Sequence, residues 1–341
     1  MKETREVSIL TGFLGAGKTT LLNAIISGKA KTRFAIVENE IGEESIDAEL
    51  LIKGDDNIVE LNNGCLCCTL NDNLYDILNQ LWLRKSSWDH LVIEATGIAD
   101  PANIARPFLT NESVQESFHL KRVICVVDAE LIEDQLKETE VAIQQIAFSE
   151  VILLNKSEKV SVAYLKELQA ILKTLNPFAE ILVALENDFK IDALFNRERF
   201  SNFYSNPKPF LTPKGMFNLM PAETAAAPKF GLGNSHRKHQ HSDIETILLR
   251  YTEDMDIEAI QHRMMVFLLT QSIGVYRIKG ILFNKNYENR VILQTVGKGM
   301  SVSTGHPWEE GDKRESKIVI IGKRLSIYGF DRMFRSCLEN K

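Results

Sequence analysis

The sequence predicts an α/β fold with a doubly wound, mainly parallel sheet, followed by a smaller α+β domain. Short apolar runs alternate with amphipathic stretches through the first part of the chain, as strands and helices do in a parallel sheet. Five prolines then fall between residues 207 and 228, and a strand-rich pattern follows them. We therefore expect one domain over residues 1–205, a proline-rich linker over 206–241 and a second domain over 242–341.

The first strand and helix enclose a glycine-rich loop. Apolar Val7, Ile9 and Leu10 predict a strand, and the apolar face of residues 21–26 predicts a helix. Between them lies GFLGAGKTT, residues 12–20, which fits the phosphate-binding P-loop pattern G-x-x-x-x-G-K-[ST]. In that arrangement backbone N–H groups point at a phosphate beside a helix N-terminus. Strand, loop and helix together therefore predict a nucleotide-binding P-loop.

The positions of this loop have distinct expected roles. Glycines lack the Cβ that would keep the backbone away from phosphate. Lys18 would reach the β- and γ-phosphates and the Thr19 hydroxyl would hold Mg²⁺, so we expect both to serve in catalysis. The residues expected to bind nucleotide are Gly12, Gly15, Ala16, Gly17, Lys18, Thr19 and Thr20.

The remaining elements of the first domain follow in alternation. Strands are predicted at residues 34–38, 58–61, 89–94, 123–128, 151–154 and 180–183. Helices are predicted at residues 74–82, 129–148 and 163–176, the last ended by Pro177. Ligands of such sheets bind beyond the carboxyl ends of the strands, and each candidate motif of this domain lies at such an end.

The strand at residues 89–94 ends at an acidic position typical of nucleotide-binding sites. It continues as IEATGIADP, with Glu94 at the strand end, where an acidic residue commonly holds Mg²⁺. Gly97 follows, and its backbone N–H could contact the γ-phosphate and sense its loss. We expect catalytic roles for Glu94 and Gly97. The alternative is an ordinary strand end with a solvated glutamate.

The strand at residues 151–154 leads into NKSE, which resembles the guanine-specificity motif N-K-x-D. In that motif the asparagine fixes the loop, the lysine stem lies on the base, and the acidic residue accepts two hydrogen bonds from guanine. Asn155, Lys156 and Glu158 occupy these places, so we expect a preference for GTP. Because glutamate replaces aspartate, strict selection of GTP over ATP stays open. The alternative is a solvated loop.

Three of the five cysteines cluster after the strand at residues 58–61. Cys65, Cys67 and Cys68 occur in NNGCLCC, and thiolates so placed select a soft ion such as Zn²⁺. Structural zinc sites commonly have four protein ligands, so three cysteines indicate an open or shared coordination position. Co²⁺ and Ni²⁺ remain alternatives to Zn²⁺. Buried cysteines or a redox pair are the alternatives to a metal site.

The second domain follows a histidine-containing segment. Its HRKHQH sequence makes His236, His239 and His241 a candidate weak metal site, with a solvated basic loop as the alternative. Strands are then predicted at residues 243–251, 275–284, 291–296 and 317–321. Helices are predicted at residues 256–271 and 326–337. This mixture predicts a small α+β domain.

The chain resembles the CobW-type family of P-loop GTPases along essentially its whole length. The resemblance rests on the GFLGAGKTT loop, ENEIGEESID at residues 38–47, NNGCLCC, IEATGIADP and NKSE, which occur in this order. That family includes zinc metallochaperones, with related branches that help insert metal into urease or hydrogenase systems. The resemblance implies a P-loop GTPase domain over residues 1–205 and the family's α+β C-terminal domain over 242–341.

The same resemblance implies a set of metal-site residues. Their side chains are thiols or carboxylates: Cys65, Cys67, Cys68, Glu38, Glu40 and Glu43. The three cysteines would be the metal ligands, and the glutamates fall in a switch-like loop where they complete metal coordination or contact nucleotide-bound Mg²⁺. Asp47 is a further candidate. The chain departs from the family at Ile41, where phenylalanine is common, and at the glutamate of NKSE.

The expected function is that of a GTP-hydrolysing metallochaperone. GTP and Mg²⁺ would order residues 38–47 and 94–100, and the cysteines that lie between them in sequence would change their affinity for a divalent metal, Zn²⁺ first. The metal would pass to a client metalloprotein. Neither segment contains a glutamine to position water, so we expect slow intrinsic hydrolysis. A P-loop small-molecule kinase, or a metal buffer or sensor with weak nucleotide turnover, stays open.

Composition and charge restrict the remaining classes. The chain has 341 residues, a net charge of −6 and 44% hydrophobic residues, as an ordinary globular protein does. Its acidic balance argues against nucleic-acid binding. No apolar run approaches the roughly 20 residues that span a bilayer, and no signal peptide precedes the first strand. We expect a cytoplasmic protein without disulfides, and a homodimer is compatible with the sequence.

Overall fold

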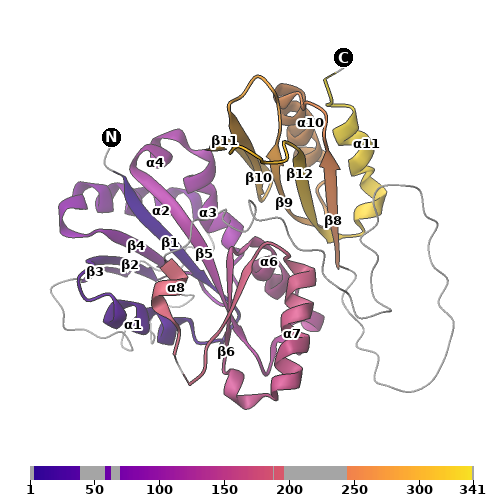
Figure 1. Ribbon diagram of the computed structural model, residues 1–341. Coiled ribbons are helices and arrows are strands. Elements are labelled where there is room, and N and C mark those ends of the chain that lie inside the picture. Colours follow the sequence, from indigo (N-terminus) through magenta and orange to yellow (C-terminus); the bar gives the residue numbers. More distant parts are fainter. Residues whose placement is uncertain (1–3, 39–57, 63–69, 187, 196–243, 340–341) are drawn as a thin grey trace, which may run out of the picture. The chain divides into compact units, whose positions relative to one another are not determined.

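The structure is a computed structural model that describes residues 4–38, 58–62, 70–186, 188–195 and 244–339. The chain divides into two compact units, Met1–Asn206 and Pro207–Lys341 (Figure 1). Residues 206–241, with their three histidines, lie outside the described residues. None of the described helices is long and apolar enough to cross a membrane.

The first unit contains a seven-stranded sheet in the order β3-β2-β4-β1-β5-β6-β7. Its strands are β1 (Arg5–Thr11), β2 (Phe34–Glu38), β3 (Ile58–Asn62), β4 (His90–Glu94), β5 (Phe118–Asp128), β6 (Val151–Asn155) and β7 (Glu180–Val183). All neighbouring strands run parallel. The predicted parallel sheet is thus confirmed, and because parallel strands share a direction, all seven carboxyl ends lie at one edge.

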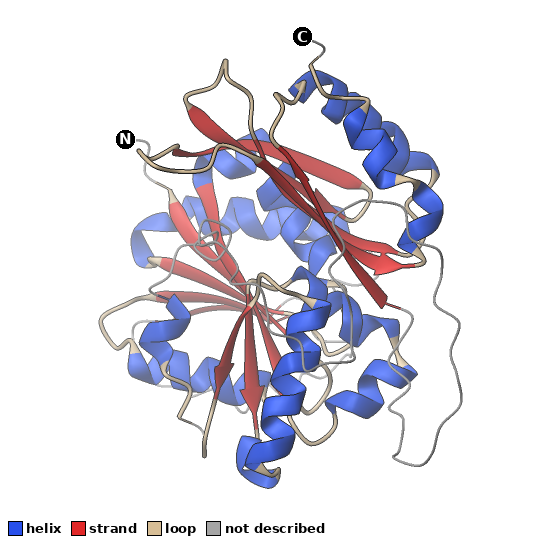
Figure 2. Ribbon diagram, turned by 45° about the vertical axis from the view of Figure 1, so that its right-hand side comes forward, coloured by secondary structure: helices blue, strands red, loops and turns tan. Residues whose placement is uncertain are grey.

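Helices cover both faces of this sheet (Figure 2). They are α1 (Lys18–Gly28), α2 (Leu70–Leu83), α3 (Pro101–Thr110), α4 (Glu112–Ser117), α5 (Ile132–Glu138), α6 (Glu140–Phe148), α7 (Val162–Leu175) and α8 (Ile191–Phe195), with short 3₁₀ turns η2 (Lys85–Ser87) and η3 (Ser157–Lys159). Apolar side chains of α1 and α8 join one core cluster with the strands. Helices α3 and α6 contact β5 and each other.

Alternation along the strands decides which side chains at the carboxyl edge face α1. The core cluster that contains α1 includes one apolar side chain near the end of each of four strands: Ile36, Val92, Val126 and Leu153. Residues two apart on a strand lie on the same face. The strand-end residues two positions later therefore face α1 as well: Glu38, Glu94, Asp128 and Asn155. Four strands thus bring polar side chains together beside the helix that follows the P-loop.

The first unit differs from the prediction in its helices. The single helix expected at residues 129–148 is wrong, because the chain breaks at Thr139 into α5 and α6. Thr139 has an extended backbone, and its hydroxyl oxygen accepts a hydrogen bond from the N–H of Val141 at 3.1 Å, as a helix N-cap does. Helices α3, α4 and α8 were not predicted. Side chains of Asp100 and Asn111 cap the first two.

The second unit contains a five-stranded antiparallel sheet in the order β11-β10-β9-β12-β8. Its elements are β8 (Ile244–Tyr251), α10 (Ile257–Thr270), β9 (Val275–Leu282), β10 (Asn289–Val296), β11 (Gly299–Pro307), β12 (Ser316–Lys323), η4 (Leu325–Tyr328) and α11 (Phe330–Arg335). Side chains from α10, η4 and α11 form one core with the sheet. The predicted α+β class is confirmed.

Two elements of the second unit depart from the prediction. The helix expected at residues 326–337 is divided into η4 and α11 by Gly329, whose φ is 58°, a left-handed conformation that glycine adopts readily. Strand β11 was not predicted. Among the described strands it pairs with β10 alone, at the edge of the sheet, and its sequence lacks the apolar run that marks a strand buried on both faces.

Candidate nucleotide and metal site

The loop between β1 and α1 requires glycine at defined positions. The φ angles of Gly12, Gly15 and Gly17 are 137°, 74° and 102°, in the region that favours glycine. A Cβ on Gly12 would lie 2.1 Å from the carbonyl oxygen of Val126, and one on Gly17 would lie 2.4 Å from Nδ2 of Asn155. The loop therefore lies directly against the ends of β5 and β6.

Lys18 and Thr19 occupy the first turn of α1. Lys18 is only 9% exposed, and its Nζ donates to the carbonyl oxygen of Phe13 at 3.4 Å, so the ammonium lies across the loop. The hydroxyl of Thr19 donates to Oε1 of Glu94 at 3.0 Å. The structure thus brings these predicted residues together. Of the other loop residues, Ala16 is buried and Thr20 is exposed.

Two buried carboxylates lie side by side at this edge. Glu38 and Glu94 are partners in the pairing of β2 with β4, and they are 7% and 8% exposed. Both face α1, and Glu94 accepts a hydrogen bond from the hydroxyl of Thr19. Carboxylate and hydroxyl oxygens are ligands that suit Mg²⁺. The residues present therefore fit a magnesium ion held by Thr19 and Glu94.

The cysteine motif begins directly after β3. The last residue of β3, Asn62, is the partner of Glu38 in the next strand, so the described chain stops beside one of the buried carboxylates. The remaining predicted metal ligands lie outside the described residues: Cys65, Cys67, Cys68, Glu40, Glu43 and Asp47. Within the described part of the chain, no group of three or more His, Cys, Asp or Glu side chains could hold a metal ion.

The NKSE segment is tied to the P-loop by two side chains. Asn155 donates from Nδ2 to the carbonyl oxygen of Ala16 at 2.9 Å. Lys156 has a left-handed backbone with φ 56°, and its Nζ contacts the carbonyl oxygen of Gly15 at 2.8 Å and Oδ2 of Asp128 at 2.7 Å. Asp128 is 1% exposed, and sequence reasoning missed it. Its position at the end of a buried strand, like that of Glu94, is the signal that could have identified it.

The acidic residue of the NKSE segment lies at the surface. The side chain of Glu158 is exposed, and its Oε2 accepts a hydrogen bond from the N–H of Glu186 at 3.4 Å. The neighbouring Ser157 is buried, and its hydroxyl donates to the carbonyl oxygen of Ala184. The carboxylate is therefore hydrogen-bonded near the end of β7 and remains accessible from solvent to a nucleotide base.

The segment after β4 packs closely on the P-loop. A Cβ on Gly97 would lie 2.6 Å from the backbone nitrogen of Leu14, so only glycine permits this approach. The side chain of Asp100 caps α3 by accepting the N–H of Ala102 at 2.9 Å, and burial raises the pKa of its carboxyl group. From α6, Gln145 donates to the carbonyl oxygen of Gly97. No sequence motif indicated Gln145.

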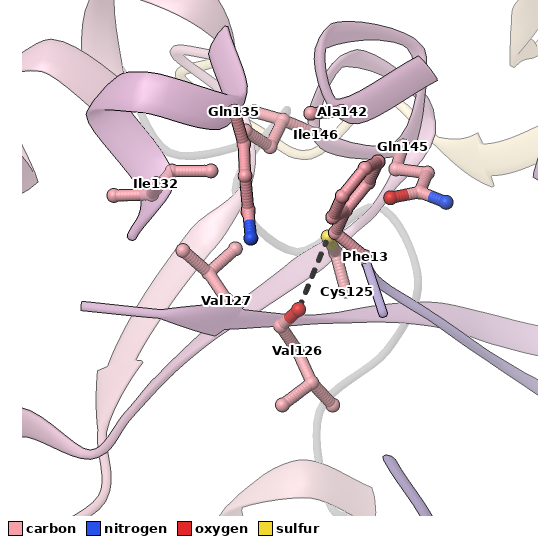
Figure 3. Close-up of a pocket in the computed structure, with 9 residues that line it drawn as sticks. All are labelled: Phe13, Cys125, Val126, Val127, Ile132, Gln135, Ala142, Gln145 and Ile146. Carbon is pink, nitrogen blue, oxygen red and sulfur yellow. Dashed lines mark hydrogen bonds between the residues drawn. The ribbon is translucent and has the colours of Figure 1, made fainter. Parts of the chain in front are cut away.

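A small, mainly apolar pocket is lined in part by Phe13 of the P-loop (Figure 3). Its lining residues are Phe13, Cys125, Val126, Val127, Ile132, Gln135, Ala142, Gln145 and Ile146. It is too narrow to hold a water molecule, so it cannot accept a nucleotide. Cys125 is 1% exposed, and burial raises the pKa of its thiol to about 12, as expected for a cysteine packed in the core.

A second polar cluster lies at the amino ends of the strands. The hydroxyl of Ser8 is 2.9 Å from Nε2 of His90, and Nδ1 of His90 is 3.2 Å from Oε2 of Glu6. The order resembles a Ser–His–acid triad. However, Ser8 is 0% exposed, the ring of Phe195 packs edge-on against His90, and burial lowers the pKa of His90. Because substrate cannot reach Ser8, this cluster is structural.

Known proteins match both units. Residues 6–183 match the model described as CobW/HypB/UreG, nucleotide-binding domain, and residues 244–338 match the cobalamin synthesis protein cobW C-terminal domain. The zinc chaperone YjiA of Escherichia coli is 31% identical over 323 residues, which cover 94% of each chain. The zinc-regulated GTPase metalloprotein activator 1 of Schizosaccharomyces pombe is 34% identical over 184 residues, or 52% of this chain and 44% of the relative.

Solved structures show the same arrangement of elements. The crystal structure of Zn(II)-bound YjiA GTPase from E. coli has a TM-score of 0.65 and 28% sequence identity, and the match covers 99% of this chain and 100% of that one. The likeness therefore extends over the parallel sheet, the P-loop and the antiparallel sheet together.

Proposed function

Because the chain belongs to the CobW/HypB/UreG family, we propose that it is a GTPase whose nucleotide state controls the binding of a divalent metal, Zn²⁺ first, and its delivery to a client metalloprotein. The observation that carries this proposal is the meeting of three features at one sheet edge. These are the P-loop, the paired carboxylates Glu38 and Glu94, and the strand end at Asn62 that precedes the cysteine motif. The relatives named as zinc chaperone and zinc-regulated GTPase support it.

The phosphates of the nucleotide would be bound by groups of the P-loop. Backbone N–H groups of the glycine-rich loop and the ammonium of Lys18 would hold the phosphates. Thr19 and Glu94 would hold Mg²⁺, which neutralises charge on the phosphate oxygens when bound. Gly97 packs closely on Leu14 of the P-loop, which supports a contact between the backbone of residues 95–100 and the γ-phosphate that would be lost on hydrolysis.

The proposed coupling follows the strand order. Glu94 contacts Thr19 at the nucleotide site, Glu38 is the partner of Glu94, and Asn62 is the partner of Glu38. A change at the γ-phosphate would therefore pass through two adjacent strand ends to Cys65, Cys67 and Cys68. Coupling between two ligands of one protein is typically worth about 1–3 kcal/mol. Glu40 and Glu43 would complete the metal site from the segment after β2.

Metal dependence of GTP turnover tests this proposal. The wild-type protein alone is expected to hydrolyse GTP slowly, because neither residues 38–47 nor residues 94–100 contain a glutamine to position water. Its hydrolysis should be faster with Zn²⁺ present. Cys67→Ser should keep the slow rate and lose the stimulation. Phosphate release measured with and without Zn²⁺ gives both rates. Fast turnover of the metal-free wild type, or stimulation that persists in Cys67→Ser, would contradict the proposal.

The preference for guanine is expected to depend on Glu158. Its exposed carboxylate lies close in sequence to the buried Asn155 and the partly exposed Lys156, and it would accept two hydrogen bonds from the guanine base. Glu158→Ala should therefore weaken GTP binding about tenfold or more, since hydrogen bonds to a charged group contribute about 1.5–3 kcal/mol. ATP binding should change little. Competition of GTP and ATP against a labelled GDP measures this ratio, with the exposed Glu167→Ala as control.

A further inference from the structure

Helix α6 carries a buried amide that faces the segment between β4 and α3. Gln145 is 1% exposed, and its Nε2 donates to the carbonyl oxygen of Gly97 at 3.1 Å and to that of Ala99 at 3.2 Å. A side-chain amide has two N–H donors, so one nitrogen serves both carbonyls. In Figure 3 the nitrogen of this amide points away from the other labelled residues. Gln145 thus fixes two peptide groups of one segment.

Other hydrogen bonds hold this segment at its two ends. The N–H of Ala95 donates to the carbonyl oxygen of Leu10 at 2.8 Å, which holds the segment to β1. At its far end, Asp100 caps α3. Between these points, Gly97 packs on the backbone of Leu14. The bonds from Gln145 therefore act on the middle of the segment, at the residue that approaches the P-loop.

We propose that Gln145 is a positioning residue for GTP hydrolysis, which holds the Gly97 segment against the P-loop in the arrangement that meets the γ-phosphate. This role rests on the proposed function, in which Gly97 contacts that phosphate. Gln145 acts through Gly97 and does not touch the nucleotide. GDP lacks the γ-phosphate, so the effect of Gln145 is confined to the triphosphate.

The test compares two substitutions on the same helix. Gln145→Met keeps the length of the side chain and removes both donors. Gln144→Met makes the same change at the neighbouring, partly exposed position and serves as the control. Turnover is measured per GDP-binding site, so that misfolded protein does not count. Gln145→Met should lower kcat for GTP about 10- to 100-fold, the range expected when a reacting geometry is displaced.

The affinities distinguish positioning from support of the fold. In Gln145→Met, the affinity for a non-hydrolysable GTP analogue should fall relative to that for GDP, and GDP affinity should stay within about threefold of wild type because GDP makes no contact with Gly97. Gln144→Met should match the wild type in both. In Gln145→Glu, burial favours the protonated carboxyl group, whose single O–H can donate to only one of the two carbonyl oxygens, so this variant should also lose turnover.

Three results would overturn the proposal. One is that Gln145→Met hydrolyses GTP at the wild-type rate per GDP-binding site. Another is an equal loss of affinity for GDP and the GTP analogue. The third is loss of GDP binding in both Gln145 variants, which would show that Gln145 supports the fold alone. Stimulation of wild-type GTP hydrolysis by Zn²⁺ is measured separately. If Zn²⁺ does not stimulate hydrolysis, the effect of the Gln145 substitutions can still be interpreted.

Discussion

Lys18→Ala is expected to lower GTP turnover about 100- to 1,000-fold, the loss typical when one group that stabilises transition-state charge is removed. The ammonium of Lys18 is largely buried and lies across the P-loop, where it contacts the carbonyl oxygen of Phe13. No other lysine or arginine belongs to the GFLGAGKTT loop, and the ammonium of Lys156, which contacts Gly15, is already paired with Asp128. Single-turnover phosphate release with saturating enzyme measures the loss without interference from weakened binding.

A lysine away from the site supplies the control for this prediction. Lys31 is exposed and follows the end of α1, so Lys31→Ala changes net charge by the same amount without altering the P-loop. It should hydrolyse GTP at the wild-type rate. If Lys18→Ala also kept that rate, the phosphate site assigned to this loop would be wrong.

Gly12→Ala should destabilise the first unit by about 2–6 kcal/mol. The added Cβ would lie 2.1 Å from the carbonyl oxygen of Val126, and relieving such overlap costs about 1–3 kcal/mol. The φ of 137° adds strain for any residue with a side chain, of about 1–3 kcal/mol. Because folded domains are stable by only about 5–15 kcal/mol, this loss should be evident in urea unfolding followed by circular dichroism.

Gly15→Ala separates the two contributions. Gly15 also has a positive φ, 74°, but a Cβ there would meet no atom within 4 Å. Its cost should be limited to backbone strain, about 1–2 kcal/mol. A Gly12→Ala protein as stable as Gly15→Ala would show that β5 moves away from the loop readily, contrary to the close packing of Gly12 on Val126.

The parts of the site that the sequence predicted are those carried by local motifs. The string GFLGAGKTT predicted the loop, and the structure joins Thr19 to Glu94 there at 3.0 Å, while the role of Thr19 toward Mg²⁺ stays a prediction. Asn155 was expected to fix a loop, and it does so by bonding to Ala16. Parallel strands made this convergence predictable, because their carboxyl ends meet at one edge.

The parts that could not be predicted depend on contacts distant in sequence. Gln145 and Gly97 are 48 residues apart, and a glutamine within an apolar helix gives no sign of its partner. The break at Thr139 was missed because apolar residues continue on both sides of it, and only the cap shows that a new helix begins. Edge strand β11 is half exposed and largely polar, so hydrophobic periodicity does not reveal it.

The assignment of the metal ligands is a proposal. The structure places Glu38 at the sheet edge and ends β3 beside it, whereas Cys65, Cys67 and Cys68 lie outside the described residues. Their assignment rests on the sequence, on the thiolate chemistry that selects Zn²⁺, and on relatives named for zinc. A metal buffer would use the same ligands without any response to nucleotide.

The dissociation constant of Zn²⁺ in the two nucleotide states tests the proposed coupling most directly. It is measured by competition with a chromophoric chelator, for wild type and Cys67→Ser, each with a non-hydrolysable GTP analogue and with GDP. The wild-type affinity should differ between the two states by about 5- to 150-fold, and Cys67→Ser should bind more weakly and lose that difference. Equal wild-type affinities in the two states would contradict the account and leave a metal-binding protein that does not sense its nucleotide.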